Sequence, residues 1–137
     1  EKIIGISREF NITELTNAIA YGNAAKAFKI AYYFGESPKQ YPLPKTLGFL
    51  FFFFWKLEQI HAYTLQSSRP SLQEAASQAG LYYRTATSYI AAAQRYPLRK
   101  TMRIISSLKE CDMKSKSNSR GSATEGELLI ELLGKIF

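Results

Sequence analysis

A chain of 137 residues, of which 46% are hydrophobic and 14% aromatic, has enough apolar side chains for one folded domain, so a disordered chain is excluded. The single cysteine, Cys111, excludes an intramolecular disulfide framework and suits a reducing compartment. A net charge of +7 favours acidic partners, either a protein surface or a phosphate backbone.

The start of the chain lacks the basic region and long apolar run of a signal peptide, so we expect a cytoplasmic protein that does not enter a membrane. Because the chain opens with Glu1 and not with Met, we expect it to be a piece of a longer protein. Residues 1–10 show no helical period and are predicted to be an extended linker from a preceding domain. Residues 11–137 are predicted to form one helical domain.

Cap residues predict the first two helices. Asn11 followed three residues later by Glu14 resembles a capping box, and it predicts a helix that Gly22 closes. Asn23 is expected to cap a second helix, which Gly35 ends. The short connection predicts that the two helices form an antiparallel pair.

A long central helix is predicted from about Leu43 to Gln66, after a proline-rich turn. Its centre, Leu47 to Trp55, is a run of nine residues without a polar side chain and rich in Phe. Crossing a bilayer takes about 20 apolar residues, and a helix that is apolar on every side must be covered on every side. This run is therefore expected to be the buried centre of the domain. The later side chains expected to point inward are Leu57, Ile60, His61 and Leu65.

Four more helices are predicted, with a polar loop from Lys114 to Ser122 before the last one. They are a short helix that the Ser71–Glu74 capping box opens and Gly80 ends, a helix from about Tyr82 to Arg95, a helix with Pro97 in its first turn, and a helix opened by the Thr124–Glu127 capping box. The expected buried positions are Tyr82, Ala86, Tyr89, Ile90 and Ala93, then Leu98, Met102, Ile105 and Leu108, and finally Leu128, Leu129, Leu132, Leu133 and Ile136. The fold class is therefore all-α, a single bundle of about seven helices around the central apolar helix.

The sequence predicts no catalytic, cofactor or metal site. His61 is the only histidine and has no second ligand to pair with, so a structural role is favoured. Basic neighbours lower a thiol pKa in principle, but a passive helix cysteine is the favoured interpretation of Cys111. Gly121 to Leu128 has the two glycines of a phosphate loop, yet Glu127 and Leu128 stand where the Lys and Ser/Thr should bind phosphate and magnesium.

Positive charge is concentrated in residues 95–120, which hold eight Lys/Arg and only two Asp/Glu. Contacts to phosphates need only such charge. The candidate phosphate or partner contacts are Arg95, Arg99, Lys100 and Arg103. A solvated helix face is the plainer explanation, and the sequence does not separate a DNA-facing edge from a subunit-facing edge.

Residues 71–96 also resemble a helix-turn-helix, whose second helix would enter the major groove of DNA. This is the alternative function. The second helix offers only Arg84 and Arg95 as cations and is otherwise largely Ala and Tyr, which disfavours base reading.

Several stretches together carry a family resemblance. They are SREFNITELTNAI (Ser7 to Ile19), GNAAKAFKI (Gly22 to Ile30), the apolar central helix, the short helix with Gly80, the aromatic and basic stretch Arg95 to Leu98, Asp112 followed by Lys114 and Lys116, and a closing leucine-rich helix. In this order they resemble the C-terminal helical domain of the bacterial DNA polymerase III delta subunit, most closely versions from the Bacteroides group. The resemblance covers nearly the whole chain. Thr13 departs from it, because the family usually has an aromatic residue there.

The resemblance implies a part in DNA replication, in the clamp loader that places the sliding clamp on primed DNA. It implies a collar domain that assembles with other loader subunits, while N-terminal domains outside this chain contact the clamp. DNA is a possible partner through the assembled complex. The delta subunit of that family does not hydrolyse ATP, so the fragment is expected to be non-catalytic. In such a domain Phe52 and Phe53 are expected to belong either to the core or to a subunit interface.

Overall fold

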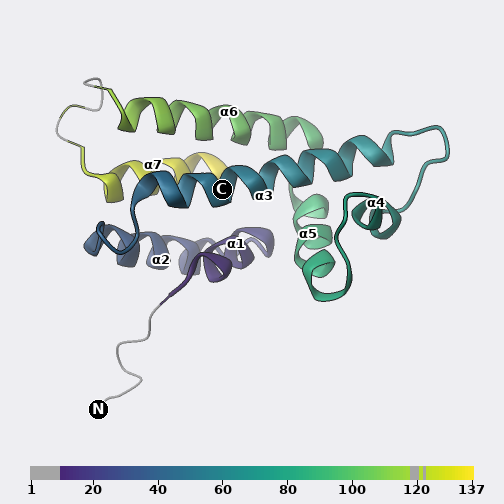
Figure 1. Cartoon of the computed structure of the whole chain (residues 1–137), viewed down its shortest axis with the longest axis horizontal. Coiled ribbons are helices and arrows are strands. Elements are labelled where there is room, and N and C mark those ends of the chain that lie inside the picture. The colour runs from purple at the N-terminus through teal and green to yellow at the C-terminus, as the bar shows by residue number, and fades with distance from the viewer. Residues whose placement is uncertain (1–9, 118–120, 122) are drawn as a thin grey trace, which may run out of the picture.

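The computed structural model describes residues 10–117, 121 and 123–137, and within them the chain forms seven helices and no strand (Figure 1). The predicted all-α fold is confirmed. The helices are α1 (Ile12–Ala20), α2 (Ala24–Glu36), α3 (Leu43–Thr64), α4 (Leu72–Gln78), α5 (Tyr83–Arg95), α6 (Leu98–Ser115) and α7 (Glu125–Ile136). Apart from Phe10, the predicted linker lies outside the described residues. None of the described helices combines the length and the apolar character needed to cross a bilayer.

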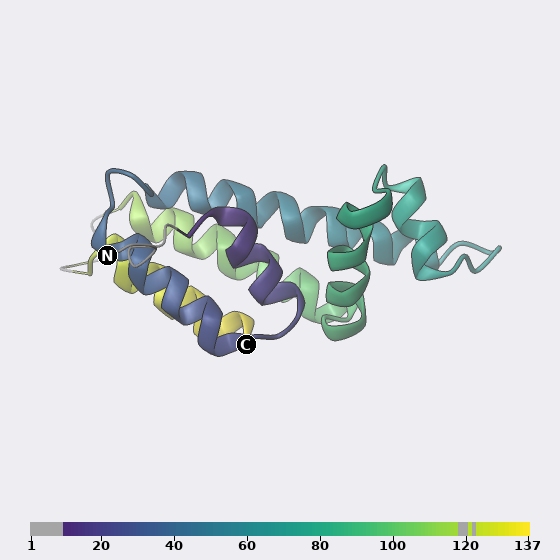
Figure 2. The same cartoon turned by 90° about the horizontal axis from the view of Figure 1, so that it is seen from below.

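Helix α3 runs through the length of the molecule, and α6 packs along it (Figures 1 and 2). Helix α2 lies between α1 and α7, and both α1 and α7 contact α3. The short pair α4 and α5 packs against the second half of α3, and α5 also contacts α1. The predicted bundle around a central helix is therefore present.

The predicted caps begin the helices as expected. The Asn11 side chain accepts a hydrogen bond from the Glu14 backbone N–H at 2.9 Å. Reciprocal capping boxes open α4, where Ser71 pairs with Glu74, and α7, where Thr124 pairs with Glu127. Each box satisfies two N–H groups that a helix start otherwise leaves without a partner.

Gly35 does not end the second helix as predicted, because α2 continues through it to Glu36. The glycine is there for close packing instead. A Cβ placed on Gly35 would lie 2.9 Å from the Cα of Gly126 in α7. The two backbones meet where neither residue has a side chain, so α2 and α7 can approach closely.

Outside the apolar run of α3, three side chains expected to be buried are exposed, namely Leu65, Tyr82 and Met102. Leu65 and Tyr82 are cap residues just outside α3 and α5, so the helical spacing does not apply to them. Met102 is exposed because the buried face of α6 is centred on Thr101, Ile104 and Leu108. The polar Thr101 is tolerated there because its Oγ1 donates a hydrogen bond to the Tyr96 carbonyl oxygen at 3.1 Å.

Helix α6 also extends further than predicted, to Ser115, so the loop is shorter than residues 114–122. The extra turn follows Cys111, which is buried against α7 and continues the apolar stripe of α6. Residues 118–120 and 122 of the predicted loop lie outside the described residues.

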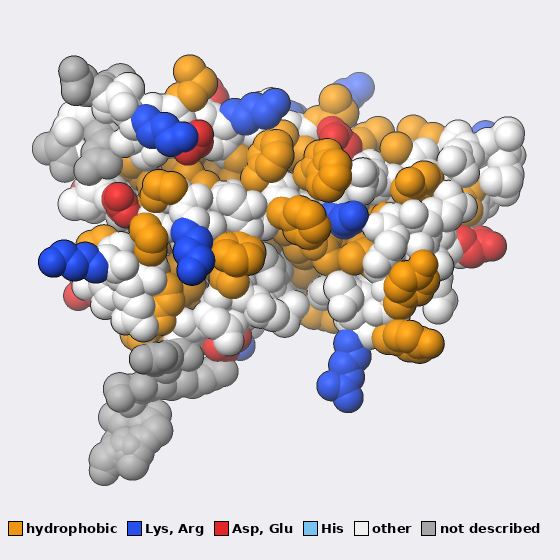
Figure 3. Space-filling model, in the orientation of Figure 1, with side chains coloured by type: hydrophobic (Ala, Val, Ile, Leu, Met, Phe, Trp, Pro, Cys, Tyr) orange, Lys and Arg blue, Asp and Glu red, His pale blue; other side chains and the backbone are white. Residues whose placement is uncertain are grey.

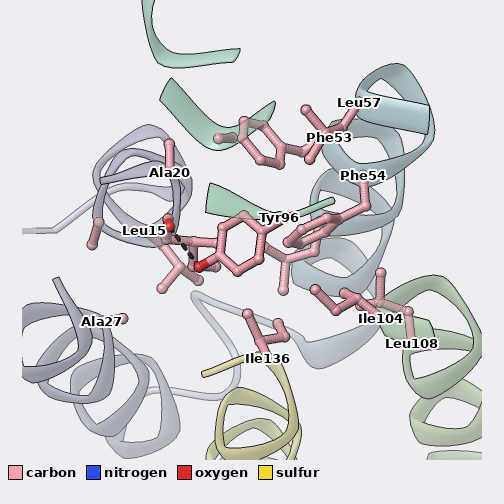
Figure 4. Packing of buried hydrophobic residues seen from close by; sticks show 14 of the residues in the cluster. Leu15, Ala20, Ala27, Phe53, Phe54, Leu57, Tyr96, Ile104, Leu108 and Ile136 are labelled. Carbon is pink, nitrogen blue, oxygen red and sulfur yellow. Dashed lines mark hydrogen bonds between the residues drawn. The ribbon is translucent and has the colours of Figure 1, made fainter. Parts of the chain in front are cut away.

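Tyr96 joins α1 and α3 in the core (Figure 4). Its hydroxyl donates a hydrogen bond to the Ile19 carbonyl oxygen of α1 at 2.8 Å, and its ring meets Phe54 of α3 edge to face at 5.8 Å. Its carbonyl oxygen accepts a hydrogen bond from His61 Nε2 at 2.7 Å. Because a carbonyl oxygen only accepts, this bond requires the proton on Nε2.

The prediction that the apolar run of α3 is buried on every side is wrong. Leu50, Phe53 and Phe54 are buried, whereas Phe52 and Trp55 face solvent. The part of α3 that carries Phe49, Phe51, Phe52 and Trp55 stays 38–51% exposed, so the other described helices do not cover it completely.

Candidate protein-binding surface

The solvent-facing side of α3 carries four large aromatic side chains. Phe49, Phe51, Phe52 and Trp55 are 46%, 38%, 51% and 40% exposed, respectively. The rings of Phe52 and Trp55 lie 6.0 Å apart. Figure 3 shows hydrophobic side chains gathered over α3 in the middle of this face. We call these four residues the aromatic face.

The exposed area of the aromatic face is large enough to matter for binding. At about 200 Å² for each aromatic side chain, the exposed fractions correspond to about 350 Å². The largest apolar patch on a monomer is typically about 300–600 Å² and is often functional. A specific interface buries about 800 Å² on each partner, so the aromatic face would form the centre of a larger contact.

A groove borders the aromatic face, between α1, α3 and α5. Its volume is about 470 Å³, and its lining comes from Ile12, Thr13, Thr16 and Asn17 of α1, Phe49, Phe52 and Phe53 of α3, and Arg84, Thr85, Ser88 and Tyr89 of α5. Phe53 and Tyr89 stack with ring centroids 4.6 Å apart. Burial raises the pKa of Tyr89 to about 12, so its hydroxyl stays neutral.

Two cations lie beside this apolar surface. The Nζ of Lys56 is 5.5 Å from the Phe52 ring centroid and 5.4 Å from the Trp55 ring centroid, and it donates a hydrogen bond to the Ala79 carbonyl oxygen at 3.0 Å. Arg84 is exposed and lines the groove. The aromatic face is therefore apolar in the middle and positive at its edge.

Phe52 and Phe53, the candidates for core or interface, differ in burial although they are neighbours on the same helix. Phe53 is only 4% exposed and belongs to the core, while Phe52 is 51% exposed. Consecutive side chains on an α-helix point in directions about 100° apart, which suffices to separate them.

The four basic candidates lie at the end of α5 and in the first two turns of α6. The guanidinium of Arg95 lies against Gly22, at the end of α5. The Lys100 Nζ is 6.0 Å from the Tyr96 ring centroid. Arg99 and Arg103, one turn apart on α6, share a shallow outer surface, with Met102 beside them.

Helices α4 and α5 form the predicted helix, turn and helix, with Gly80 in the turn at a φ of 87°. The exposed end of α5 presents Tyr83, Arg84 and Thr85. Tyr83 has a φ of 55°, a backbone conformation that side chains rarely adopt. Arg84 is the only cation in the first turn of this helix.

The single histidine and the single cysteine both pack as structural residues. His61 is half-buried and holds the Tyr96 carbonyl oxygen. Burial, reinforced by the Glu131 carboxylate, raises the pKa of Cys111 to about 11. The basic neighbours therefore do not make Cys111 a reactive thiolate at neutral pH.

The glycine-containing stretch Gly121 to Leu128 is a helix start. Thr124 and Glu127 form the capping box of α7 there, in which the backbone N–H groups of Thr124 and Glu127 each donate to the other residue's side chain. Ser122 lies outside the described residues. Across the described parts of the chain, no three His, Cys, Asp or Glu side chains gather as a metal site would require.

Comparison of the chain with protein-family models, with curated proteins and with solved structures found no match.

The sequence predictions missed most of this surface. Trp55, Lys56, Arg84 and Tyr89 were not identified as parts of one site. The sequence did contain one signal that part of the aromatic run is exposed. Helical spacing places hydrophilic Gln59 on the same side of α3 as Gly48, Phe52 and Trp55, and this side is opposite the one that carries Leu50 and Leu57.

Proposed function

We propose that this chain is the subunit-association (collar) domain of a DNA polymerase III delta subunit, in the cytoplasmic clamp loader that places the sliding clamp on primed DNA. It is a non-catalytic assembly domain whose partners are the other clamp-loader subunits. The sliding clamp is contacted by N-terminal domains outside this chain. DNA is a possible partner through the assembled complex.

The observation that carries the proposal is the aromatic face of α3. Four aromatic residues on one side of the central helix are costly to leave in water, and burying them against a partner removes about 350 Å² of apolar surface. An all-α domain with such a face suits assembly with other helical domains. The order of the sequence stretches from Ser7 to the closing leucine-rich helix supports the choice of the clamp loader.

Gel filtration tests this proposal. The purified chain is mixed with each of the other clamp-loader subunits of its organism, and with all of them together. We expect the chain to co-migrate with at least one subunit or with the assembled complex. If it elutes alone in every mixture while remaining folded by circular dichroism, the proposal is wrong.

A helix-turn-helix DNA-binding domain is the second candidate, favoured by the arrangement of α4 and α5 with Arg84 and Thr85 exposed. Fluorescence anisotropy with duplex DNA at several salt concentrations separates the two. A DNA reader prefers one sequence over others, whereas charge alone produces binding that is blind to sequence and lost as salt rises.

A further inference from the structure

We infer that the groove between α1, α3 and α5 binds an acidic amphipathic helix of a neighbouring clamp-loader subunit, which places a large apolar side chain over Phe53 and Tyr89. This inference rests on the proposed function and adds the location and the chemistry of the contact.

The floor and one wall of the groove are suited to an apolar anchor. Phe53 and Tyr89 stack with an interplanar angle of 26° and are both buried, so they form a fixed aromatic base. Phe49 and Phe52 stand beside them, about half exposed. A side chain from a partner would contact aromatic carbon on two sides and exclude water from both, as central anchors of interfaces do.

Two of the polar side chains of the groove, Thr16 and Ser88, have partners in their own helices. Thr16 Oγ1 donates a hydrogen bond to the Thr13 carbonyl oxygen at 3.0 Å, and Ser88 Oγ donates one to the Thr85 carbonyl oxygen at 3.3 Å. These two hydroxyl protons are therefore already used, and an apolar anchor beside Thr16 and Ser88 leaves neither of them without an acceptor.

The charges at the groove select an acidic partner. Arg84 is the charged residue of the lining, and no carboxylate of the described residues lies within ion-pair distance of it. Lys56 adds a second positive charge beside Phe52. A partner with Asp or Glu next to its anchor would pair with these cations, whereas a second copy of this chain, with a net charge of +7, would be repelled.

A helix is the form of partner that the surface fits. The groove is walled by three helices, and the described residues contain no strand whose edge could pair with an extended segment. A helix presents apolar anchors at i, i+3, i+4 and i+7, and it carries acidic residues on the flanks of that stripe.

The test measures the affinity of this chain for the loader subunit that co-migrates with it, by fluorescence anisotropy of a dye-labelled chain. The groove variants are Phe52→Ala and Arg84→Glu. The matched controls are Tyr32→Ala, an exposed aromatic on α2, and Lys39→Glu, an exposed cation in the turn before α3, neither of which lines the groove. Circular dichroism confirms that each variant is folded.

We expect Phe52→Ala and Arg84→Glu each to weaken binding by about tenfold or more, and each control to change it by less than about threefold. The Arg84→Glu effect should shrink as salt is raised, since it is electrostatic. If the wild-type chain associates but both groove variants bind as tightly as the controls, this inference is wrong while the proposed function stands. Loss of binding in Phe52→Ala alone would overturn the acidic character of the partner. Absence of any association by the wild-type chain would overturn the proposed function, and this inference with it.

Discussion

Phe52 and Phe53 are neighbours in the sequence, and truncating them should have very different effects on stability. Phe53 is 4% exposed and contacts both Tyr89 and Phe54, at centroid distances of 4.6 and 5.3 Å. Replacing such a buried Phe by Ala costs about 3–5 kcal/mol, because apolar contacts are lost and a cavity remains.

Phe52 is 51% exposed, and its contacts are the Trp55 ring and the Lys56 ammonium. At an exposed site a cation–π contact contributes about 0.5–1 kcal/mol. We therefore expect Phe52→Ala to lower the free energy of unfolding by about 1 kcal/mol, and Phe53→Ala by at least three times as much.

Urea unfolding followed by far-UV circular dichroism measures both changes. If the dependence of the unfolding free energy on urea concentration has the same slope in each variant, the variants differ in stability alone. If Phe53→Ala does not fold, Phe53→Leu provides a milder truncation at the same position. Equal losses for Phe52→Ala and Phe53→Ala would refute the division of α3 into a buried and an exposed side.

Three further predictions test the packing of the bundle. Gly126→Ala should destabilise the protein by about 1–3 kcal/mol, since the new Cβ would meet the α2 backbone at 2.9 Å. Gly134→Ala in the same helix has open space around the new Cβ and should stabilise the protein by up to about 1 kcal/mol. Thermal unfolding of the two variants measures both changes. Tyr96→Phe removes a buried hydrogen bond to α1 and should cost about 1 kcal/mol in urea unfolding, and an unchanged midpoint would contradict that. Because the pKa of Cys111 is raised to about 11, iodoacetamide at pH 8 should modify the native chain far more slowly than the chain in urea, and equal rates would show an accessible thiolate.

Much of the candidate surface could not be predicted from the sequence. The groove joins residues that are distant along the chain, such as Thr16, Phe53 and Ser88. No local pattern connects them, because they meet only where α1 and α5 pack against α3. The aromatic run itself was visible in the sequence, but its exposed side was not.

The sequence by itself determined the helices. Some features depend only on neighbours within four residues, so they can be identified from the sequence alone. They are the Asn11 cap, the Ser71 and Thr124 capping boxes, and the stripe of buried leucines in α7. Only the tertiary structure decided which side of each helix is covered. The need for a glycine at position 35, inside α2, comes from the backbone of α7, which passes close to it. Met102 is exposed because the side of α6 that faces the core is the one that carries Ile104. Phe52 remains 51% exposed because α1 and α5 border it at the groove without covering it, and burial depends on neighbours that are distant in the sequence.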